Sequence, residues 1–308
     1  MLTWIRSLAL VAATSFLAAC GGSDDHPSTT LSVAQSDQRF SILTEAVNAA
    51  GLADTLAGPG PLTVFAPTND AFAALLTELG ITKDALLANK PLLTAVLTYH
   101  VLPAKVERAQ VPLGQPVTTV QGGIFKVDQR NGALVITDGR NRTATITATD
   151  RMLRNGLIHT IDRVLLPANL DIVQTAQALP QFSILVDAVV AAGLVDALKA
   201  PGPLTVFAPT NDAFAALLAE LGVTADQLLA DTPLLTQVLT YHVVAGRVLA
   251  TGIVPGAPVT TLQGATFTVG ADLRITDGRL RSAGIVATDV LTSNGVVHVI
   301  DRVILPPQ

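Results

Sequence analysis

A single cysteine, few aromatic residues and few charges are the first features of this sequence. Cys20 is the only cysteine among 308 residues, so no internal disulfide can form and packing must stabilise the fold. Aromatic residues make up 4% and charged residues 14%, whereas hydrophobic residues reach 49%, which predicts an aliphatic core and excludes a disordered chain. The net charge is -5 and no cluster of Lys and Arg offsets it, so nucleic acid is excluded as a partner.

The sequence also lacks the motifs of common catalytic and metal sites. It contains no G-x-S-x-G nucleophile elbow, no H-E-x-x-H, no P-loop and no EF-hand. The histidines lie too far apart in sequence to form a ligand motif, and they are His26, His100, His159, His242 and His298. We therefore expect no metal, no other cofactor and no catalytic residues, which means that the chain is not expected to be an enzyme.

The first twenty residues have the layout of an export signal. Arg6 precedes an apolar stretch over residues 8–17 that is too short to span a membrane, and small residues follow. Residues 17–20, with the sequence LAAC, resemble the bacterial lipobox, and the resemblance implies cleavage before Cys20 and its acylation; the alternative is an ordinary signal peptide with an incidental cysteine. Gly21 in place of Asp resembles lipoproteins that are not retained at the inner membrane. Residues 1–20 are therefore predicted to be a lipoprotein signal peptide and residues 21–28 a flexible tether. We expect an exported, lipid-anchored envelope protein, at the outer rather than the inner membrane, facing the periplasm or the surface.

The remaining sequence contains two copies of one long repeat. Residues 59–80 return at 201–222, an offset of 142 (201 − 59), and the one difference is Thr77 against Ala219. The offset falls to 139 by the ITDG segments at 136–139 and 275–278, so the second copy has lost three residues, which a shorter hairpin near Asn131 and Gly132 would explain. A repeat of this length indicates duplicated domains, predicted at residues 29–167 and 171–306 with a linker at 168–170.

Each copy begins with helical periodicity and ends with strand patterns. Apolar residues at Phe40, Leu43 and Val47 predict a helix that ends at Gly51, and a further helix is expected after the strand at residues 63–66, capped by Thr68 or Asn69. A third helix runs to Tyr99. Five β-rich runs separated by turn residues follow between residues 117 and 165. The fold class is therefore α+β, with helices first and a mostly antiparallel sheet afterwards.

Three segments of each copy resemble the signatures of the fasciclin domain family. They are TVFAPTNDAF at 63–72, the Tyr99-His100 pair, and NGLIHTIDRVLLP at 155–167; the second copy repeats all three, with Tyr241-His242 as its pair and NGVVHVIDRVILP at 294–306. The resemblance covers nearly the whole chain after the tether. It implies two tandem domains, each a β-wedge or sandwich packed with several α-helices. It also implies adhesion or interaction rather than catalysis.

The Tyr-His pairs are candidate partner-binding residues with a competing structural role. His100 and His242 are expected at helix C-termini, where an imidazole can donate to a buried carbonyl and where the helix dipole favours the protonated ring. They either lock helix to sheet or, together with Tyr99 and Tyr241, serve a pH-sensitive or partner-contacting role.

A second candidate site follows from the resemblance to animal fasciclin domains. In those domains an Asp followed by two apolar residues, before the second signature, is associated with receptor binding, and Asp289, Val290 and Leu291 match that pattern. The first copy departs from it, because Asp150 is followed by Arg151. The alternative is a turn in which Asp289 caps backbone amides.

The function indicated is a cell-surface or periplasmic adhesion or interaction lipoprotein. Its expected partners are a protein, a polysaccharide or an extracellular-matrix surface, and the membrane is reached only through the lipid on Cys20. The alternative is a small-ligand-binding envelope protein with a pocket in the wedge or between the domains.

Overall fold

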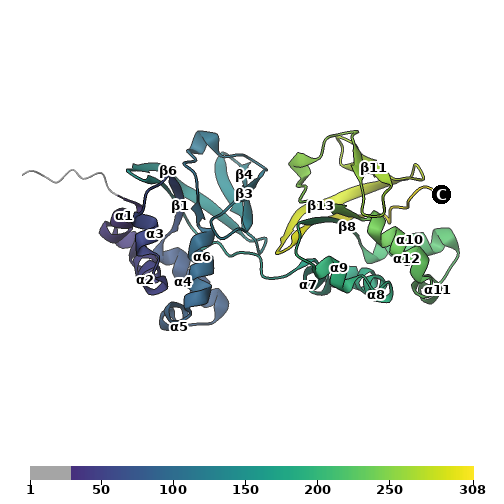
Figure 1. Cartoon of the computed structure of the whole chain (residues 1–308), viewed down its shortest axis with the longest axis horizontal. Helices are drawn as coiled ribbons and strands as arrows, with labels where there is room; N and C mark the ends of the chain where they lie inside the picture. The colour runs from purple at the N-terminus through teal and green to yellow at the C-terminus, as the bar shows by residue number, and fades with distance from the viewer. Residues whose placement is uncertain (1–28) are drawn as a thin grey trace, which may run out of the picture.

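The computed structural model describes residues 29–308, which form two domains of one topology placed end to end (Figure 1). The predicted signal peptide, the tether and the lipidation site at Cys20 lie outside the described residues. None of the helices in residues 29–308 is long and apolar enough to cross a membrane.

The elements of domain 1 follow the predicted order of helices first and strands afterwards. Its helices are α1 (Thr30–Ser36), α2 (Ser41–Ala50), α3 (Ala53–Ala57), α4 (Asn69–Leu79), α5 (Lys83–Ala88) and α6 (Lys90–Tyr99). Its strands are β1 (Leu62–Pro67), β2 (Val101–Leu102), β3 (Pro116–Thr118), β4 (Ile124–Arg130), β5 (Ala133–Thr137), β6 (Thr143–Leu153) and β7 (Gly156–Ile161). The predicted α+β class is confirmed.

Domain 2 repeats these elements. Its helices are α7 (Ile172–Gln177), α8 (Ser183–Ala191), α9 (Val195–Lys199), α10 (Asn211–Leu221), α11 (Ala225–Ala230) and α12 (Thr232–Tyr241). Its strands are β8 (Leu204–Pro209), β9 (Val243–Ala245), β10 (Pro258–Thr260), β11 (Thr266–Val269), β12 (Arg274–Thr276), β13 (Ser282–Thr292) and β14 (Gly295–Ile300). Strands β11 and β12 are shorter than β4 and β5, which confirms that the missing residues shorten this hairpin.

Each domain contains one seven-stranded sheet, in the order β2-β1-β7-β6-β5-β4-β3 in domain 1. All neighbours are antiparallel except β1 and β7, which run parallel because the chain between them crosses through the helices and the other strands. Strand β6 carries two register shifts, between Ile146 and Ala148 and between Ala148 and Arg151. These irregularities bend the sheet into two halves that fold towards each other.

Local chemistry sets the limits of the helix that follows β1. The hydroxyl of Thr68 accepts a hydrogen bond from the backbone N–H of Ala71, and Gly80 ends α4 in the left-handed conformation, with φ of 63°. The Asn69 side chain accepts from the Ile42 N–H and donates to the Gln38 carbonyl, so it ties the start of α4 to the start of α2. Thr68 is therefore the cap, while Asn69 joins two helices.

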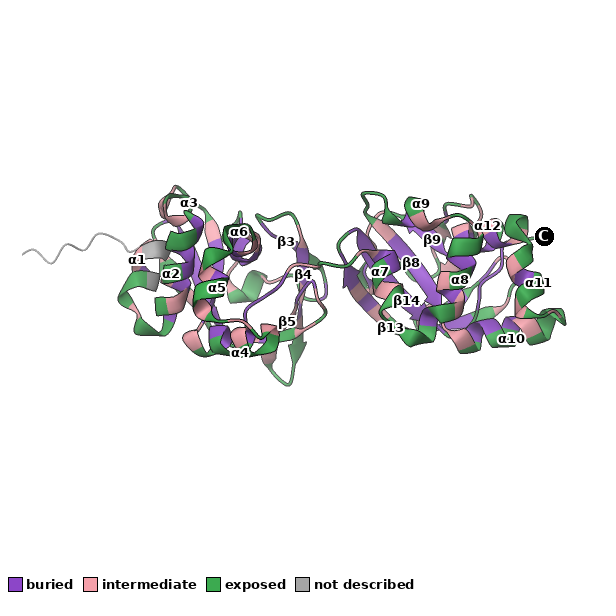
Figure 2. Ribbon diagram, turned by 90° about the horizontal axis from the view of Figure 1, so that it is seen from below, coloured by how far each residue is buried: buried purple, intermediate pink, exposed green. Residues whose placement is uncertain are grey.

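Strand β1 separates two hydrophobic cores in domain 1. Val64 and Ala66 face the helices, and Phe65 faces the space between the two halves of the sheet, where it packs edge-on against Phe125. All three are at most 6% exposed, and domain 2 has the same arrangement around β8. Figure 2 shows this as buried strands behind helices whose outer faces are exposed. Each domain is therefore a helical layer on a bent sheet, as the sequence predicts.

Candidate functional site

The first Tyr-His pair stands at the end of α6, where it fastens that helix to the sheet. Tyr99 is 0% exposed; its hydroxyl donates to the Ile124 carbonyl and accepts from the Gly139 amide. In domain 2 the Tyr241 hydroxyl donates to the Thr266 carbonyl at 2.8 Å and accepts from the amide of Gly278 at 2.9 Å. Burial raises the pKa of both phenols, that of Tyr241 to about 12. Both hydroxyls are thus neutral structural groups.

The histidine of each pair is held in one neutral tautomer. His100 is 2% exposed; its Nδ1–H donates to the Val96 carbonyl at 2.7 Å, and its Nε2 accepts from the Leu165 amide at 2.9 Å. His242 makes the same bonds with Val238 and Ile304, at 2.7 and 3.1 Å. The expected donation to a buried carbonyl is confirmed.

The expectation that the helix C-terminus favours the protonated ring is wrong. Burial lowers the pKa of both His100 and His242 from 6.5 to about 4, and it outweighs the carbonyl bond that favours the charged form. The chain that follows the last strand of each domain donates to the ring and helps to bury it, and this burial is the largest cause of the lowered pKa.

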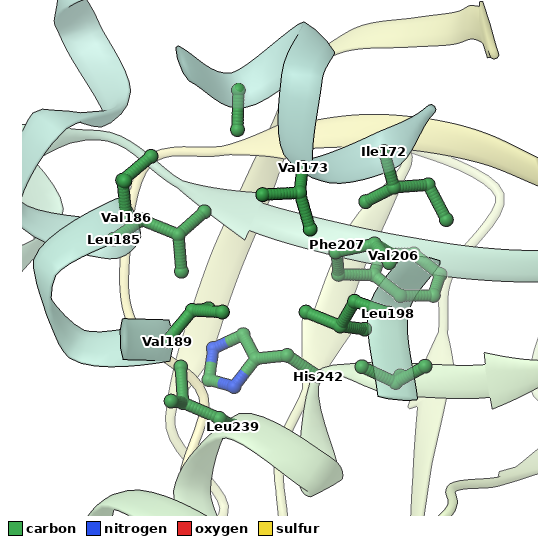
Figure 3. Close-up of a pocket in the computed structure, with 12 residues that line it drawn as sticks. Ile172, Val173, Leu185, Val186, Val189, Leu198, Val206, Phe207, Leu239 and His242 are labelled. Carbon is green, nitrogen blue, oxygen red and sulfur yellow. The ribbon is translucent and has the colours of Figure 1, made fainter. Parts of the chain in front are cut away.

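The space beside each of these histidines is too small for a ligand. In domain 2 it measures about 30 Å³ and is lined by aliphatic side chains such as Val173, Leu185 and Leu239 around His242 (Figure 3). The corresponding space beside His100 measures about 20 Å³. Small-molecule pockets begin at about 300 Å³. The spaces beside these two histidines are therefore too small for the ligand of the alternative hypothesis.

The second histidine of each domain is also fully engaged. His159 Nε2–H donates to the Val106 carbonyl at 2.9 Å, and its Nδ1 accepts from the Asp150 amide at 3.3 Å. His298 makes the same bonds with Val248 and Asp289, at 2.9 and 3.3 Å. Both rings are 0% exposed, and burial lowers their pKa values. Within residues 29–308, every histidine thus has both ring nitrogens bound to main-chain groups, and no group of three or more possible metal ligands occurs there.

The predicted partner-binding motif at residues 289–291 lies at the contact between the domains. Asp289 occupies a left-handed position in β13, with φ of 61°; its Oδ1 accepts from the Ala250 amide at 2.8 Å, and its Oδ2 pairs with Lys126 of domain 1 at 3.0 Å. Leu291 is 3% exposed, and Val290 packs on the helical core of domain 2. The carboxylate does cap a backbone amide, although in an irregular strand rather than a turn.

Partner contact by these seven residues stays a prediction. Asp289 and Leu291 would become accessible only if the two domains separated, and the Tyr-His pairs only if a domain opened. The residues are Tyr99, His100, Tyr241, His242, Asp289, Val290 and Leu291.

Hydrogen bonds and an apolar cluster join the two domains. Asn141 donates from Nδ2 to the Leu291 carbonyl at 3.1 Å and accepts from the Leu291 amide at 2.7 Å, and Thr251 donates to the Gly114 carbonyl at 2.6 Å. We call this contact the interdomain junction, and its apolar part consists of Ile124, Leu249, Leu291 and Val296.

The junction forms where the second copy departs from the first. Leu249 takes the place of Glu107, and buried Leu291 takes the place of Met152, which is 48% exposed in domain 1. A side chain at Gly114 would meet Thr251 at 2.6 Å, so only glycine allows this approach. The apolar residues that are specific to domain 2 thus form a surface, and domain 1 covers it.

A buried carboxylate that the sequence analysis did not single out organises each domain. Asp138 is 1% exposed and accepts hydrogen bonds from the amides of Arg140, Arg142 and Leu166, and from the guanidinium of Arg142 at 2.8 and 3.0 Å. Arg142 also binds Glu78 of α4 at 2.8 Å. The group joins helix, sheet and C-terminal segment. Its one sequence signal was the repetition of the ITDG segment.

The same cluster in domain 2 is centred on Asp277. Arg281 binds Asp277 at 2.9 Å and Glu220 at 3.1 Å, and the amide of Leu305 donates to Asp277 at 2.9 Å. The geometry is that of a structural clamp, because the carboxylate oxygens are surrounded by donors from its own domain.

Comparison with known proteins finds the same unit twice. The model of the fasciclin domain family matches residues 38–167 and again residues 180–306. Transforming growth factor-beta-induced protein ig-h3 of Sus scrofa is 31% identical over 253 residues, which are 81% of this chain and 35% of that protein. Protein sll1483 of Synechocystis sp. is 48% identical over 140 residues, 44% of this chain and 74% of that protein.

A solved structure is also similar. The FAS1 domain pair from the insect cell adhesion molecule Fasciclin I aligns with 87% of this chain and 97% of its own, at 18% identity and a TM-score of 0.44. This chain spans 35% of the length of ig-h3, so it corresponds to a part of that longer relative.

Proposed function

Because the chain belongs to the fasciclin domain family, we propose that it is a non-enzymatic adhesion or interaction protein of the cell envelope. Membership of this family supports a role in adhesion or interaction in general. The finer proposal is that the two domains bind a protein, a polysaccharide or a matrix surface, and that a lipid on Cys20 holds them near a membrane.

The engagement of the histidines supports this proposal most directly. A general base needs a free ring nitrogen within reach of the proton that it removes. In His100, His159, His242 and His298 each nitrogen is bound to a main-chain group, and each ring has a lowered pKa. These side chains serve packing, which leaves the exposed loops and helix faces for recognition.

The interdomain junction favours binding to a repetitive partner. Two copies held at a fixed spacing can engage neighbouring sites of a polymer, and the second contact is then intramolecular. A lipid anchor adds to this effect, because it gathers many copies on one surface. We propose the outer membrane for the anchor, facing the periplasm or the surface.

A binding experiment with the lipidated chain tests the proposal. Cells that display it are expected to adhere to at least one member of an array of polysaccharides, matrix proteins and envelope proteins. Cys20→Ser is expected to move the chain from the membrane fraction to the soluble fraction without abolishing binding by the purified chain. Absence of binding across the array would contradict the adhesion proposal. A Cys20→Ser variant that stayed in the membrane fraction would contradict the proposed lipid anchor.

The junction gives a second prediction. Leu291→Asp places an unpaired carboxylate in the apolar contact and is expected to weaken domain docking by about 3 kcal/mol. Small-angle scattering should then give a larger radius of gyration, and retention on a polymeric partner should decrease. Met152→Asp is the matched control, because this counterpart in domain 1 is exposed and should change neither measurement. Equal effects of the two variants would show that the junction is not a docking contact.

A further inference from the structure

A cavity of about 330 Å³ lies beside the interdomain junction and is lined by both domains. Domain 1 and the linker contribute the turn at residues 121–124, Gly139, Pro167 and Ala168, and domain 2 contributes Arg247 and residues 291–293. It is about ten times larger than the space beside His242, and it reaches the size of small-molecule pockets, which begin at about 300 Å³.

Arg247 brings a positive charge into this cavity. It follows β9 in the chain and is half-buried, and its Nε is buried with no hydrogen-bonding partner among residues 29–308. The ion pairs of these residues do not include it. Burial lowers the pKa of Arg247. The guanidinium therefore lies in the cavity wall as a cation without an anion.

A second donor in the same wall also lacks a partner. Thr292 is 4% exposed, and its hydroxyl is buried without a hydrogen bond to any of residues 29–308. A buried polar group without a partner costs about 1–3 kcal/mol, more when the group is charged. Arg247 and Thr292 come from different segments of domain 2 and both line this cavity, and each holds a buried donor without a partner, so an acceptor placed in the cavity is within the reach of both side chains after a small adjustment.

The two copies differ at the position of Arg247 and at the position of its neighbouring carboxylate. Lys105 occupies the position of Arg247 in domain 1, where it is exposed and pairs with Glu107 at 3.1 Å. In domain 2 the position of Glu107 is taken by Leu249, which is 2% exposed in the interdomain junction. Domain 2 thus has an arginine at the domain contact where domain 1 has a surface ion pair, and it has no carboxylate at the position of Glu107.

Carboxylates of either domain near the cavity do not take the place of the missing one. Asp138 lies near Tyr99, but its oxygens accept from Arg142 and three backbone amides. Asp289 pairs with Lys126. The cavity lining itself contains no Asp or Glu.

We propose that the cavity binds a small oxyanion, a carboxylate or a phosphate carried by a compact polar molecule, through the Arg247 guanidinium and the Thr292 hydroxyl. The planar guanidinium matches the two oxygens of such a group. The Gln121 side chain and the turn at residues 122–124 of domain 1 form the opposite wall. Binding there bridges the two domains and stabilises the interdomain junction. The argument for this site does not require the adhesive function proposed above.

Calorimetric titration and thermal unfolding of residues 29–308 test the proposal, with glucuronate, inorganic phosphate and glucose as probes. Glucose is the neutral match of glucuronate, and sodium chloride at equal ionic strength controls for screening. Saturable binding of glucuronate alone identifies the carboxylate form, and saturable binding of phosphate identifies the phosphate form. Arg247→Leu is expected to lower the affinity about a hundredfold and Thr292→Val about fivefold, as expected for bonds to a charged and to a neutral donor.

Two further results distinguish specific binding in the cavity from a general effect of ions on the protein. Arg247→Leu should leave the unliganded chain at least as stable as the wild type, because the variant removes an unpaired charge rather than a contact. Lys105→Leu, the counterpart change in domain 1, should leave anion binding unchanged. Absence of saturable binding for both anions, or equal loss in the Arg247 and Lys105 variants, would overturn the proposal.

Discussion

Asp138→Ala is expected to lower the free energy of unfolding of domain 1 by about 4 kcal/mol, the range found when one partner of a buried ion pair is removed. The substitution leaves the Arg142 guanidinium with Glu78 and the Val164 carbonyl, and it leaves the amides of Arg140, Arg142 and Leu166 without an acceptor. Because these donors belong to the turn after β5, the residue that precedes β6 and the C-terminal segment of the domain, the substitution should loosen all three. Urea unfolding combined with hydrogen exchange, resolved by peptide, measures the effect in each domain.

A matched carboxylate in the same domain provides the control. Asp162 is exposed and accepts one hydrogen bond, from the Thr145 amide at 2.7 Å. Asp162→Ala should cost about 1 kcal/mol, the usual value of one hydrogen bond. If the two variants lost equal stability, the clamp would not be the organising contact that the geometry indicates.

Acidification from pH 7 to pH 4 is expected to destabilise both domains, by about 3 kcal/mol for each of His100 and His242. In the unfolded chain these rings take up a proton near pH 6.5, whereas in the folded chain they stay neutral until about pH 4. The unfolded state therefore binds protons first as the pH falls. The contribution of the two neutral rings to the free energy of unfolding is complete above pH 6.5 and is lost progressively between pH 6.5 and pH 4.

Denaturant midpoints measured across this pH range check the prediction. His100→Ala is expected to be less stable at neutral pH, because it leaves the Leu165 amide and the Val96 carbonyl without their partner. The variant should also reduce the pH dependence of the stability of domain 1. The stability of domain 2 should keep its pH dependence, because His242 is unchanged. A stability that rises between pH 6.5 and pH 4 would contradict the assignment of neutral rings.

Features that depend on neighbours in the sequence could be predicted from the sequence. A cap at Thr68 or Asn69, the helix stop at Gly51 and the donation from His100 to a buried carbonyl all involve groups within four residues of each other. The length of the repeat and the fasciclin signatures gave the number of domains and the α+β class. The strands could be predicted because apolar and polar residues alternate along them, and this alternation decides which side chains of the sheet face a core.

Features that depend on distant segments could not be predicted. The pKa of His100 depends on burial under the segment that contains Leu165, which is 65 residues away, and this outweighed the local helix-dipole argument. Lys126 reaches Asp289 over a separation of 163 residues, and no local pattern marks that pair. The junction could not be predicted either, because the sequence does not show that Leu291 is covered by the other domain while its counterpart Met152 is exposed.

The most direct test of the central claim, recognition without catalysis, is a mass measurement on a partner after binding. A partner retained by the purified chain is eluted with competing soluble partner, and the intact masses of both molecules are then determined. The account predicts reversible retention, with both masses unchanged after prolonged contact. A shortened or modified partner, or a covalent adduct on the chain, would contradict it.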